Sequence, residues 1–519
     1  MKCSPSFAPA FTSLGIYYAE VSTPPDLDRS SKCFQKAFEL DAREGEAARR
    51  LAEGFAEERE WDLVEVVARR TIDGEGGLEG GREKMASGRY LPTNAWAWKA
   101  VGVVELVLVL AFYIVPELMD IQNRRNYPSA IQAFQVSLRA DQDDFLSWQR
   151  LGESYAKSGR HAASIKALNR ALELRADDWM CLYLIGDVHK LMGQFQNAIK
   201  VYEDVLRIHP EEICVLLSLA ETHLAHGRSQ SSEGFITRAE ASVVASLSVV
   251  LDLFDKSPGF RRVAWKTAAD AVFELSRIVS FNDTMSVERV LAPLASLINI
   301  TETDDTIGGI LDLPILAKNA NVNGFTAVQL AVAAYNYRIS LGNLDDTATA
   351  SAWFDLGMAL NRFSTQTRDE TKSSKAADKA KHCIQKALAA DRRNDIFWNA
   401  LGNLNFAENP KVSQHSYIKA LECNLKVSHC RDLLFCELSV VQSALTWTNL
   451  GLLYLYHGDA ELATEALFRA QSLDPDYVLA WVGQGLVAAT NGHHAESSAL
   501  FEHAISLSAD VVRLVNVNV

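Results

Sequence analysis

The sequence lacks the features that would place it in a membrane, in the secretory pathway or along a nucleic acid. No run among its 519 residues reaches the ~20 apolar residues that a membrane-spanning helix needs. The first residues, MKCSPSFAPAFTSLG, have no apolar core of signal-peptide length. The 8 cysteines include no C-x-x-C pair, which favours reduced thiols in the cytoplasm or nucleus over a disulfide framework. A net charge of −14 argues against a surface that grips nucleic acid throughout.

Candidates for catalysis or ligand binding are also few. The segment DGEGGLEGGREK is rich in glycine but contains no G-K-[ST], so it is not a phosphate-binding loop. Two close histidine pairs, His223 with His226 and His493 with His494, have no third ligand nearby, which favours turn and helix-face residues over a metal site. We therefore predict no catalytic, cofactor-binding or metal-binding residue, and a protein that is not an enzyme.

What the sequence does contain is a regular period of about 34 residues. One unit, FLSWQRLGESYAKSGRHAASIKALNRALEL, begins at Phe145, and the next, WMCLYLIGDVHKLMGQFQNAIKVYEDVLRIHP, begins at Trp179. Large residues at positions 4, 7, 11 and 24 of such a unit fill the space between two antiparallel helices. Small residues at positions 8, 20 and 27 let the helix backbones approach. The pattern W-x2-L-G-x2-Y, with a later A, F, A and P, is typical of tetratricopeptide repeats.

The same register recurs in about eleven units along the chain. Because a single unit cannot bury its own apolar face, the units must stack. We therefore predict an all-α fold, a tetratricopeptide-repeat superhelical solenoid of helix-turn-helix units. Residues that mark the units in order are Gly15, Ala52, Trp98, Trp148, Gly186, Ala220, Trp265, Trp353, Trp398, Trp447 and Trp481.

The breaks in the period divide the chain. We expect N-terminal repeat units in 1–72, a Gly-rich linker in 73–94, repeat units in 95–244, irregular helical repeats in 245–343 with a long loop over 300–323, and C-terminal repeat units in 344–519. The segment STQTRDETKSSKAADKAK is expected to lengthen a turn inside one C-terminal unit.

Two units are too long for the period by the same amount. In the first, Trp98 and Gly102 fit positions 4 and 8, but Ala130 and Phe134 reach positions 20 and 24 only if a block of sixteen residues is removed. Removing 107–122, VLVLAFYIVPELMDIQ, restores the period, and removing 427–442, VSHCRDLLFCELSVVQ, does so before Trp447. If the first insert is part of the protein, we expect it to prolong the helix beyond Leu106 and to expose an apolar patch.

The two inserts have the ends expected of introns. Each begins with Val, whose codons start with GT, and ends with Gln, whose codon CAG ends with AG. Our hypothesis is that both are retained introns, and two genuine family-specific loops are the alternative.

Known binding modes of such repeats fit the sequence poorly. In a clamp for a peptide's terminal carboxylate, Asn403 and Asn449 match two positions, but Asn399, Leu479 and Gly483 replace the required cations. Each tryptophan at position 4 is interpreted as core. The basic pairs Arg124-Arg125, Arg261-Arg262 and Arg392-Arg393 are more typical of solvated turns than of an RNA track, with direct RNA contact as the alternative. Partner-binding residues stay unknown.

Several segments, taken in order, resemble the tetratricopeptide scaffold subunits of superkiller (Ski) complexes. They are SSKCFQKAFELDAREGEAARRLAEGFAE, AIQAFQVSLRADQDDFLSWQRLGESYAKSGR, IFWNALGNLNF and ALTWTNLGLLYLYHGDAELATEALFRAQSLDPDYVLAWVGQGLVA. The ordered set makes the resemblance specific, together with the irregular middle between Arg238 and Asn323. It covers nearly the whole chain outside the inserts.

The resemblance implies a cytoplasmic scaffold without activity of its own. In that family the repeats hold a superfamily 2 RNA helicase and a WD-repeat propeller subunit, and the assembly feeds RNA to the exosome for 3′-to-5′ decay. Family members are longer, so we expect this chain to be a middle piece or a truncated gene model. The alternative function is an adaptor of another multi-subunit complex, of the ubiquitin-ligase or glycosyltransferase type.

The intron hypothesis predicts a spliced transcript that lacks both inserts. Sixteen residues correspond to 48 nucleotides, and removal of each block keeps the reading frame. Sequencing the transcript measures this directly. A mature message that retains both blocks would establish them as loops of the protein.

Overall fold

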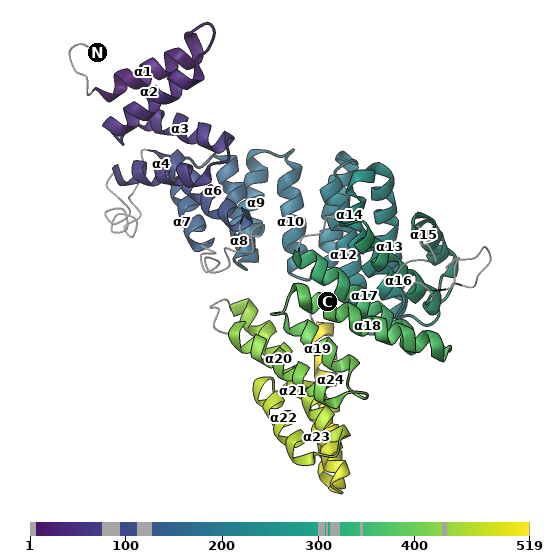
Figure 1. Ribbon diagram of the computed structural model, residues 1–519. Helices are drawn as coiled ribbons and strands as arrows, with labels where there is room; N and C mark the ends of the chain where they lie inside the picture. The colour runs from purple at the N-terminus through teal and green to yellow at the C-terminus, as the bar shows by residue number, and fades with distance from the viewer. Residues whose placement is uncertain are drawn as a thin grey trace. The chain divides into compact units, whose positions relative to one another are not determined.

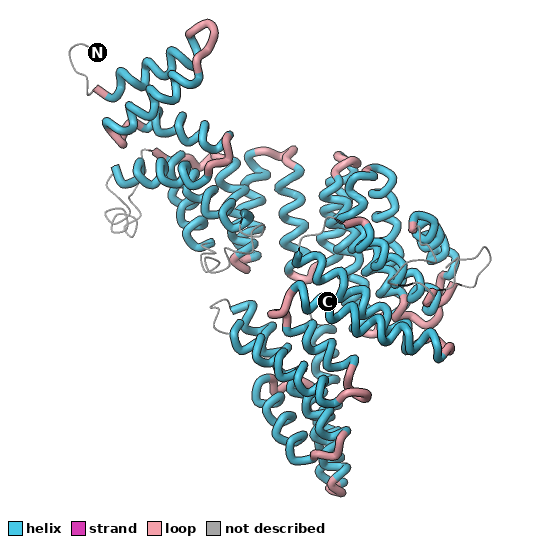
Figure 2. Tube along the Cα trace, viewed as in Figure 1, coloured by secondary structure: helices cyan, strands magenta, loops and turns pink. Residues whose placement is uncertain are grey.

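A computed structural model describes residues 7–74, 94–111, 127–298, 307, 310–311, 322–342, 346–427 and 433–517. Within these ranges the chain forms helices and no strand (Figures 1 and 2), so the all-α prediction is confirmed. No helix in the described part is long and apolar enough to cross a bilayer. The chain divides into two compact units, Met1–Pro210 and Glu211–Val519.

Helices of the first unit pack as consecutive antiparallel pairs, in which α1 packs on α2, α3 on α4, α6 on α7, α8 on α9, and α10 on α11. Their bounds are α1 (Ala8–Ile16), α2 (Leu27–Leu40), α3 (Gly45–Glu57), α4 (Trp61–Gly74), α6 (Ala95–Ala111), α7 (Tyr127–Ala140), α8 (Phe145–Lys157), α9 (His161–Leu174), α10 (Trp179–Leu191) and α11 (Phe195–Ile208).

The second unit begins with a pair of longer helices and a less regular group, then returns to regular pairs. Its helices are α12 (Ile213–Ser232), α13 (Ile236–Lys256), α14 (Arg261–Leu275), α15 (Thr284–Leu297), α16 (Gly324–Ser340), α17 (Asp346–Gln366), α18 (Glu370–Ala390), α19 (Asp395–Leu404), α20 (Pro410–Val427), α21 (Leu433–Tyr456), α22 (Ala460–Leu473), α23 (Val478–Thr490) and α24 (His494–Val517). In the irregular middle α14 packs on α16 rather than on its chain neighbour α15.

A contact between position 8 of the first helix and position 24 of the second recurs through the pairs. An added Cβ on Gly152 would lie 2.6 Å from Leu168, and one on Gly186 would lie 2.5 Å from Tyr202. A Cβ added on Gly485 would likewise lie 2.6 Å from Phe501. Only glycine admits the partner's side chain at this distance, so the predicted register is confirmed at these units.

Serine at position 20 adds a hydrogen bond to this contact. Its hydroxyl donates to the carbonyl of the position-8 glycine, from Ser164 to Gly152 over 2.7 Å and from Ser497 to Gly485 over 2.9 Å. Both hydroxyls are buried, and the bond satisfies a carbonyl oxygen whose lone pairs face the neighbouring helix. The sequence pattern required only a small residue at this position.

The first long unit keeps its register across its insert. Gly102 on α6 faces Phe134 on α7, with 2.9 Å between the added Cβ and the ring, and Ala130 is fully buried. The helix α6 runs to Ala111, which confirms the expected prolongation beyond Leu106. Residues 112–122 of the first insert, 428–432 of the second and the linker 75–93 lie outside the described residues, as do the side chains of both inserts. The rest of the second insert, from Leu433, begins α21.

One expected turn is a pair of lengthened helices instead. The segment STQTRDETKSSKAADKAK lies mostly in α18, and the connection between α17 and α18 is only Thr367–Asp369. The prediction of a longer turn was wrong because the added residues are mainly helix formers. Asp369 begins α18 by accepting the backbone N–H groups of Thr371 and Lys372.

The expected divisions meet the helices at different places. Residues 73 and 95 fall near the end of α4 and at the start of α6, whereas the division between 244 and 245 falls inside α13. Most of the 300–323 loop lies outside the described residues, although Ile307 and Ile310 within it are buried.

Two glycine-to-alanine variants test the position-8 contact. Gly152→Ala places its Cβ against the fully buried Leu168, so we expect destabilisation of about 1–3 kcal/mol from overpacking. Gly54→Ala on α3 meets open space and should stabilise by about 0.5–1 kcal/mol through helix propensity. Thermal unfolding followed by circular dichroism measures both. Equal shifts in the two variants would contradict the packing explanation.

Candidate functional site

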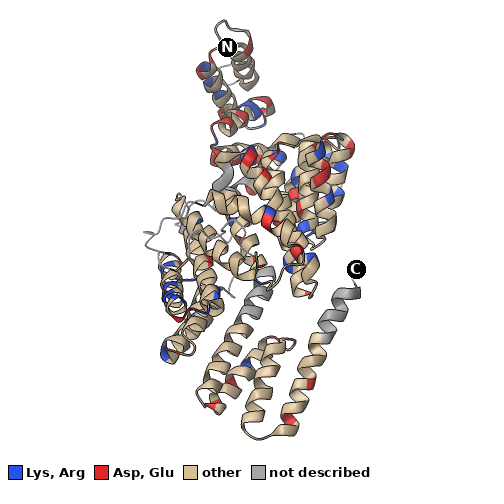
Figure 3. Ribbon diagram, turned by 90° about the vertical axis from the view of Figure 1, so that its right-hand side faces the viewer, with Lys and Arg blue, Asp and Glu red and all other residues tan. Residues whose placement is uncertain are grey.

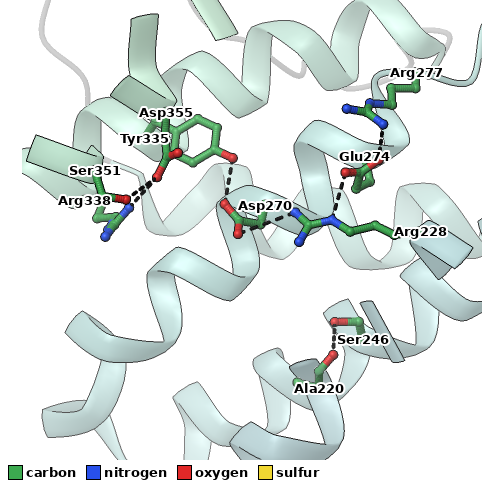
Figure 4. Close-up of polar contacts among 10 residues, drawn as sticks. All are labelled: Ala220, Arg228, Ser246, Asp270, Glu274, Arg277, Tyr335, Arg338, Ser351 and Asp355. Atoms are coloured by element: carbon green, nitrogen blue, oxygen red, sulfur yellow. Dashed lines mark hydrogen bonds and ion pairs between the residues drawn. The ribbon is translucent and has the colours of Figure 1, made fainter. Parts of the chain in front are cut away.

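A network of charged and hydrogen-bonded side chains, most of them buried or half-buried, joins four helices in the second unit (Figure 4). Arg228 on α12 donates to Glu274 on α14 over 2.9 Å and lies 3.5 Å from Asp270. The hydroxyl of Tyr335 on α16 donates to Asp270 over 2.8 Å. Arg338 on α16 pairs with Asp355 on α17 over 2.9 Å. The chain of contacts therefore runs from α12 to α17.

Burial sets the electrostatics of this network. Burial, followed by repulsion from Asp270, raises the pKa of the Asp355 carboxyl despite the nearby Arg338. Burial and then Asp270 hold the pKa of the Tyr335 hydroxyl well above its ordinary value. Burial alone would lower the pKa of Arg228, but Asp270 and Glu274 outweigh it and raise that pKa. The tyrosine thus stays a neutral donor at neutral pH.

The composition of the network indicates a structural role rather than a catalytic or metal-binding one. Every charged group in it faces an opposite charge or a hydroxyl, and the described residues contain no group of three or more His, Cys, Asp or Glu side chains that would hold a metal ion. It lies where α14 and α16 pack without a position-8 glycine. We infer that it fixes the packing of these helices.

A second feature is a groove in the first unit between α7 and α9, with α8 beneath. We call it the cationic groove. It has a volume of ≈ 710 Å³, three cations line it, and no Asp or Glu does. The cations are Arg139 on α7 and Lys166 and Arg170 on α9. Leu138 and the rings of Trp148 and Tyr155 provide the apolar part of its surface.

The polar groups of the groove differ in how they are used inside the protein. The indole N–H of Trp148 donates to the carbonyl of Gln142 over 2.9 Å. Arg170 pairs with Glu173 over 2.7 Å and lies 3.8 Å from Asp143. Within the described part of the chain, the exposed Arg139 and Lys166 form no ion pair. Two positive charges therefore stand in the groove without a carboxylate partner.

The asparagines considered for a carboxylate clamp are bound within the protein. Asn449 donates its amide to the oxygen of Asn399 over 3.0 Å, and Asn399 is buried. Asn403 accepts the hydroxyl of Tyr417 over 2.7 Å. Leu479 is exposed, and Gly483 packs against Leu467. These positions offer a carboxylate ligand no cation.

The histidine pairs lie on helices or turns. His223 is largely buried on α12, where burial and then the neighbouring His226 lower its pKa to about 4. His226 contacts the amide of Gln230 at 3.0 Å. His493 and His494 are exposed at the start of α24.

The basic pairs are placed only in part. Arg392 and Arg393 lie exposed in the turn between α18 and α19. Arg124-Arg125 and the side chains of Arg261-Arg262 lie outside the described residues. Figure 3 shows both basic and acidic residues distributed over the helices.

Of the tryptophans that mark the units, Trp98 and Trp265 are buried in the core, whereas others are half-buried. Trp98 is 3% exposed, which fits the interpretation as core. Trp398 and Trp481, like Trp148, are half-buried, and each indole donates to a carbonyl in the preceding turn, that of Arg392 over 2.9 Å or Pro475 over 2.7 Å. The interpretation as core is thus incomplete, because the indole also anchors the connection to the previous unit.

Comparison with known proteins identifies tetratricopeptide repeats in two segments of the chain. Two family models described as tetratricopeptide repeat match residues 144–211 and 448–510, on α8–α11 and α21–α24. A solved structure titled as YrrB, a TPR protein with an unusual peptide-binding site, is 16% identical with a TM-score of 0.31, and covers 46% of this chain and 98% of that one. The all-α tetratricopeptide-repeat prediction is confirmed.

Three curated relatives match the chain over most of its length. Superkiller protein 3 of Schizosaccharomyces pombe is 31% identical over 407 residues, 78% of this chain and 27% of that protein. Superkiller protein 3 of Saccharomyces cerevisiae is 26% identical over 98% of this chain and 32% of its own length. Superkiller complex protein 3 of Homo sapiens is 26% identical over 96% and 27%. The chain thus spans about a third of these relatives or less.

The ion network generates a stability prediction. Arg338 is 5% exposed, so Arg338→Met leaves the Asp355 carboxylate without its cation and should lower the unfolding free energy by about 3–5 kcal/mol. The double variant Arg338→Met/Asp355→Leu removes both charges and should recover most of that loss. Urea unfolding measures both.

An exposed pair is the control. Lys419→Met breaks the pair with Glu422, whose side chain is 47% exposed, and should change stability by less than about 1 kcal/mol. A double variant as unstable as Arg338→Met would contradict the role of the unpaired carboxylate.

Proposed function

We propose that this chain, a homologue of the proteins named superkiller protein 3, forms part of a non-catalytic protein–protein interaction scaffold of a Ski complex. The observation that carries the proposal is the extent of the similarity. The Saccharomyces cerevisiae and Homo sapiens relatives match 98% and 96% of the chain, well beyond the 144–211 and 448–510 segments that the general repeat models match.

The similarity includes the irregular middle, which general repeat proteins have no reason to share. The ion network around Asp270 and Tyr335 lies there, and it depends on residues outside the repeat pattern. A relative that aligns through this region shares more than the repeat period. The name superkiller complex protein 3, carried by the Homo sapiens relative, supports membership in a complex.

The partners we propose are those of the family. They are a superfamily 2 RNA helicase subunit and a WD-repeat propeller subunit, with the RNA exosome as an indirect partner in 3′-to-5′ mRNA decay in the cytoplasm. The chain itself would supply surfaces, because paired helices expose long faces on which other proteins dock.

Affinity purification tests this proposal. A tagged form of the chain, and of any longer protein that contains it, should recover a helicase and a WD-repeat protein together from cytoplasmic extract. Mass spectrometry identifies them, and a tagged tetratricopeptide protein from another complex is the control. Recovery of neither partner would contradict the proposal. Recovery of ubiquitin-ligase or glycosyltransferase subunits instead would support the alternative function, an adaptor of another multi-subunit complex.

A further inference from the structure

The cationic groove carries charge that the fold does not use. Arg139 and Lys166 are exposed, line the same groove and form no ion pair within the described part of the chain. The chain as a whole has a net charge of −14, so a local excess of cations without any lining carboxylate stands out from its surroundings. Helix packing does not require these two cations, because both project from exposed positions.

The repeat itself supplies a comparison. In the repeat register, Arg139 is position 29 of one unit, and Lys166 and Arg170 are positions 22 and 26 of the next. One repeat later the same three positions hold Glu173, Lys200 and Asp204. Two of the three charges are therefore reversed. The fold is the same at both places, so the three cations are a property of one groove.

The same pattern is absent near the C-terminal pairs. Between α20 and α22 the corresponding positions are Glu422, Glu465 and Arg469. Arg469 there pairs with Glu465 over 2.7 Å. Like the equivalent positions one repeat after the cationic groove, this interval carries its own carboxylates and has no excess of positive charge.

We propose that the cationic groove binds an acidic segment of a partner protein that also carries an apolar side chain. Arg139 and Lys166 would pair with carboxylates of the segment, and Arg139 can do so with two parallel hydrogen bonds. The apolar side chain would lie against Leu138 and the ring of Trp148. The volume of ≈ 710 Å³ falls in the range of sites that hold a few side chains. This inference deepens the scaffold proposal and rests on it.

Charge favours a protein segment over RNA. A nucleic-acid backbone carries a phosphate at every nucleotide, so an RNA track needs cations that continue along the path. One repeat beyond Lys166 and Arg170, the equivalent positions hold Glu173 and Asp204 beside Lys200, so the run of cations that a phosphate backbone needs does not continue there. A short acidic segment ends where the cations end.

Fluorescence anisotropy with the whole chain tests the proposal. The probe is a fluorescein-labelled peptide, Asp-Glu-Asp-Leu-Glu-Asp-Glu, compared with its Asn/Gln counterpart and with a labelled oligouridylate. We expect the acidic peptide to bind, its affinity to fall with added salt, and the neutral peptide to bind at least tenfold more weakly.

Charge reversal places the site. Arg139→Glu/Lys166→Glu should weaken peptide binding at least tenfold. The matched control, Lys200→Glu/Arg207→Glu, makes the same charge change at two exposed positions of α11, outside the cationic groove, and should stay within twofold of the unaltered chain. Circular dichroism verifies that both variants fold. A leucine-to-serine peptide should bind more weakly if the apolar contact is made.

Three outcomes would overturn the proposal. They are absence of peptide binding to the unaltered chain, equal loss in the groove variant and its control, and binding of the oligouridylate but not the peptide through the groove. The assay needs neither helicase nor WD-repeat protein. Its failure is therefore distinct from failure of the scaffold proposal, which the purification decides.

Discussion

The close approach of two helices at a residue without a side chain is the contact on which this fold depends. At position 8 the glycine backbone receives the large side chain of position 24, and where position 20 is serine its hydroxyl ties the two helices further. Gly152 with Leu168 and Gly485 with Phe501 show the same geometry at distant points of the chain. Because each contact joins two helices of one unit, each unit sets its own register and then offers its outer faces to its neighbours.

A contact between helix faces leaves the length of their connection free. Gly152 meets Leu168 in a unit of ordinary length, Gly357 meets Ile384 in a longer one, and Gly102 meets Phe134 across the whole first insert. Closing a longer connection adds little entropy cost, about 0.6 kcal/mol for each doubling. In the unit of Gly357 the additional residues lengthen the two helices α17 and α18. In the unit of Gly102 the additional residues are the 107–122 insert. A chain of this kind therefore tolerates an added block between its helices, whether a splicing error or a genuine loop.

The same logic decides how far the sequence predicts the structure. The register at Gly102 and Phe134 is predictable despite the insert, because the pattern on each helix is intact. The prediction of a long turn in STQTRDETKSSKAADKAK was wrong. Counting residues against the period shows that a unit is too long, but not whether the additional residues form a loop or continue a helix. The network of Arg228, Asp270, Tyr335 and Asp355 has no signal in the sequence, since its members follow no period and come together only through the packing of α12, α14, α16 and α17. The cationic groove is intermediate: positions 22, 26 and 29 are readable from the sequence, but that they line one groove is a fact of three dimensions.

Function in such a chain must lie in the positions that the repeat leaves free. Positions 8, 20 and 24 lie between the two helices and are constrained by packing, so their residue types are similar in units with different functions. Exposed positions are not constrained by packing in this way, so a residue there that differs from its equivalents in other units needs another explanation. Arg139 is such a departure, because the equivalent position of the next, otherwise similar helix holds Glu173. An unpaired surface cation does little for stability, since even a paired one contributes about 0–1 kcal/mol. Its natural counterpart is a charge that another molecule brings.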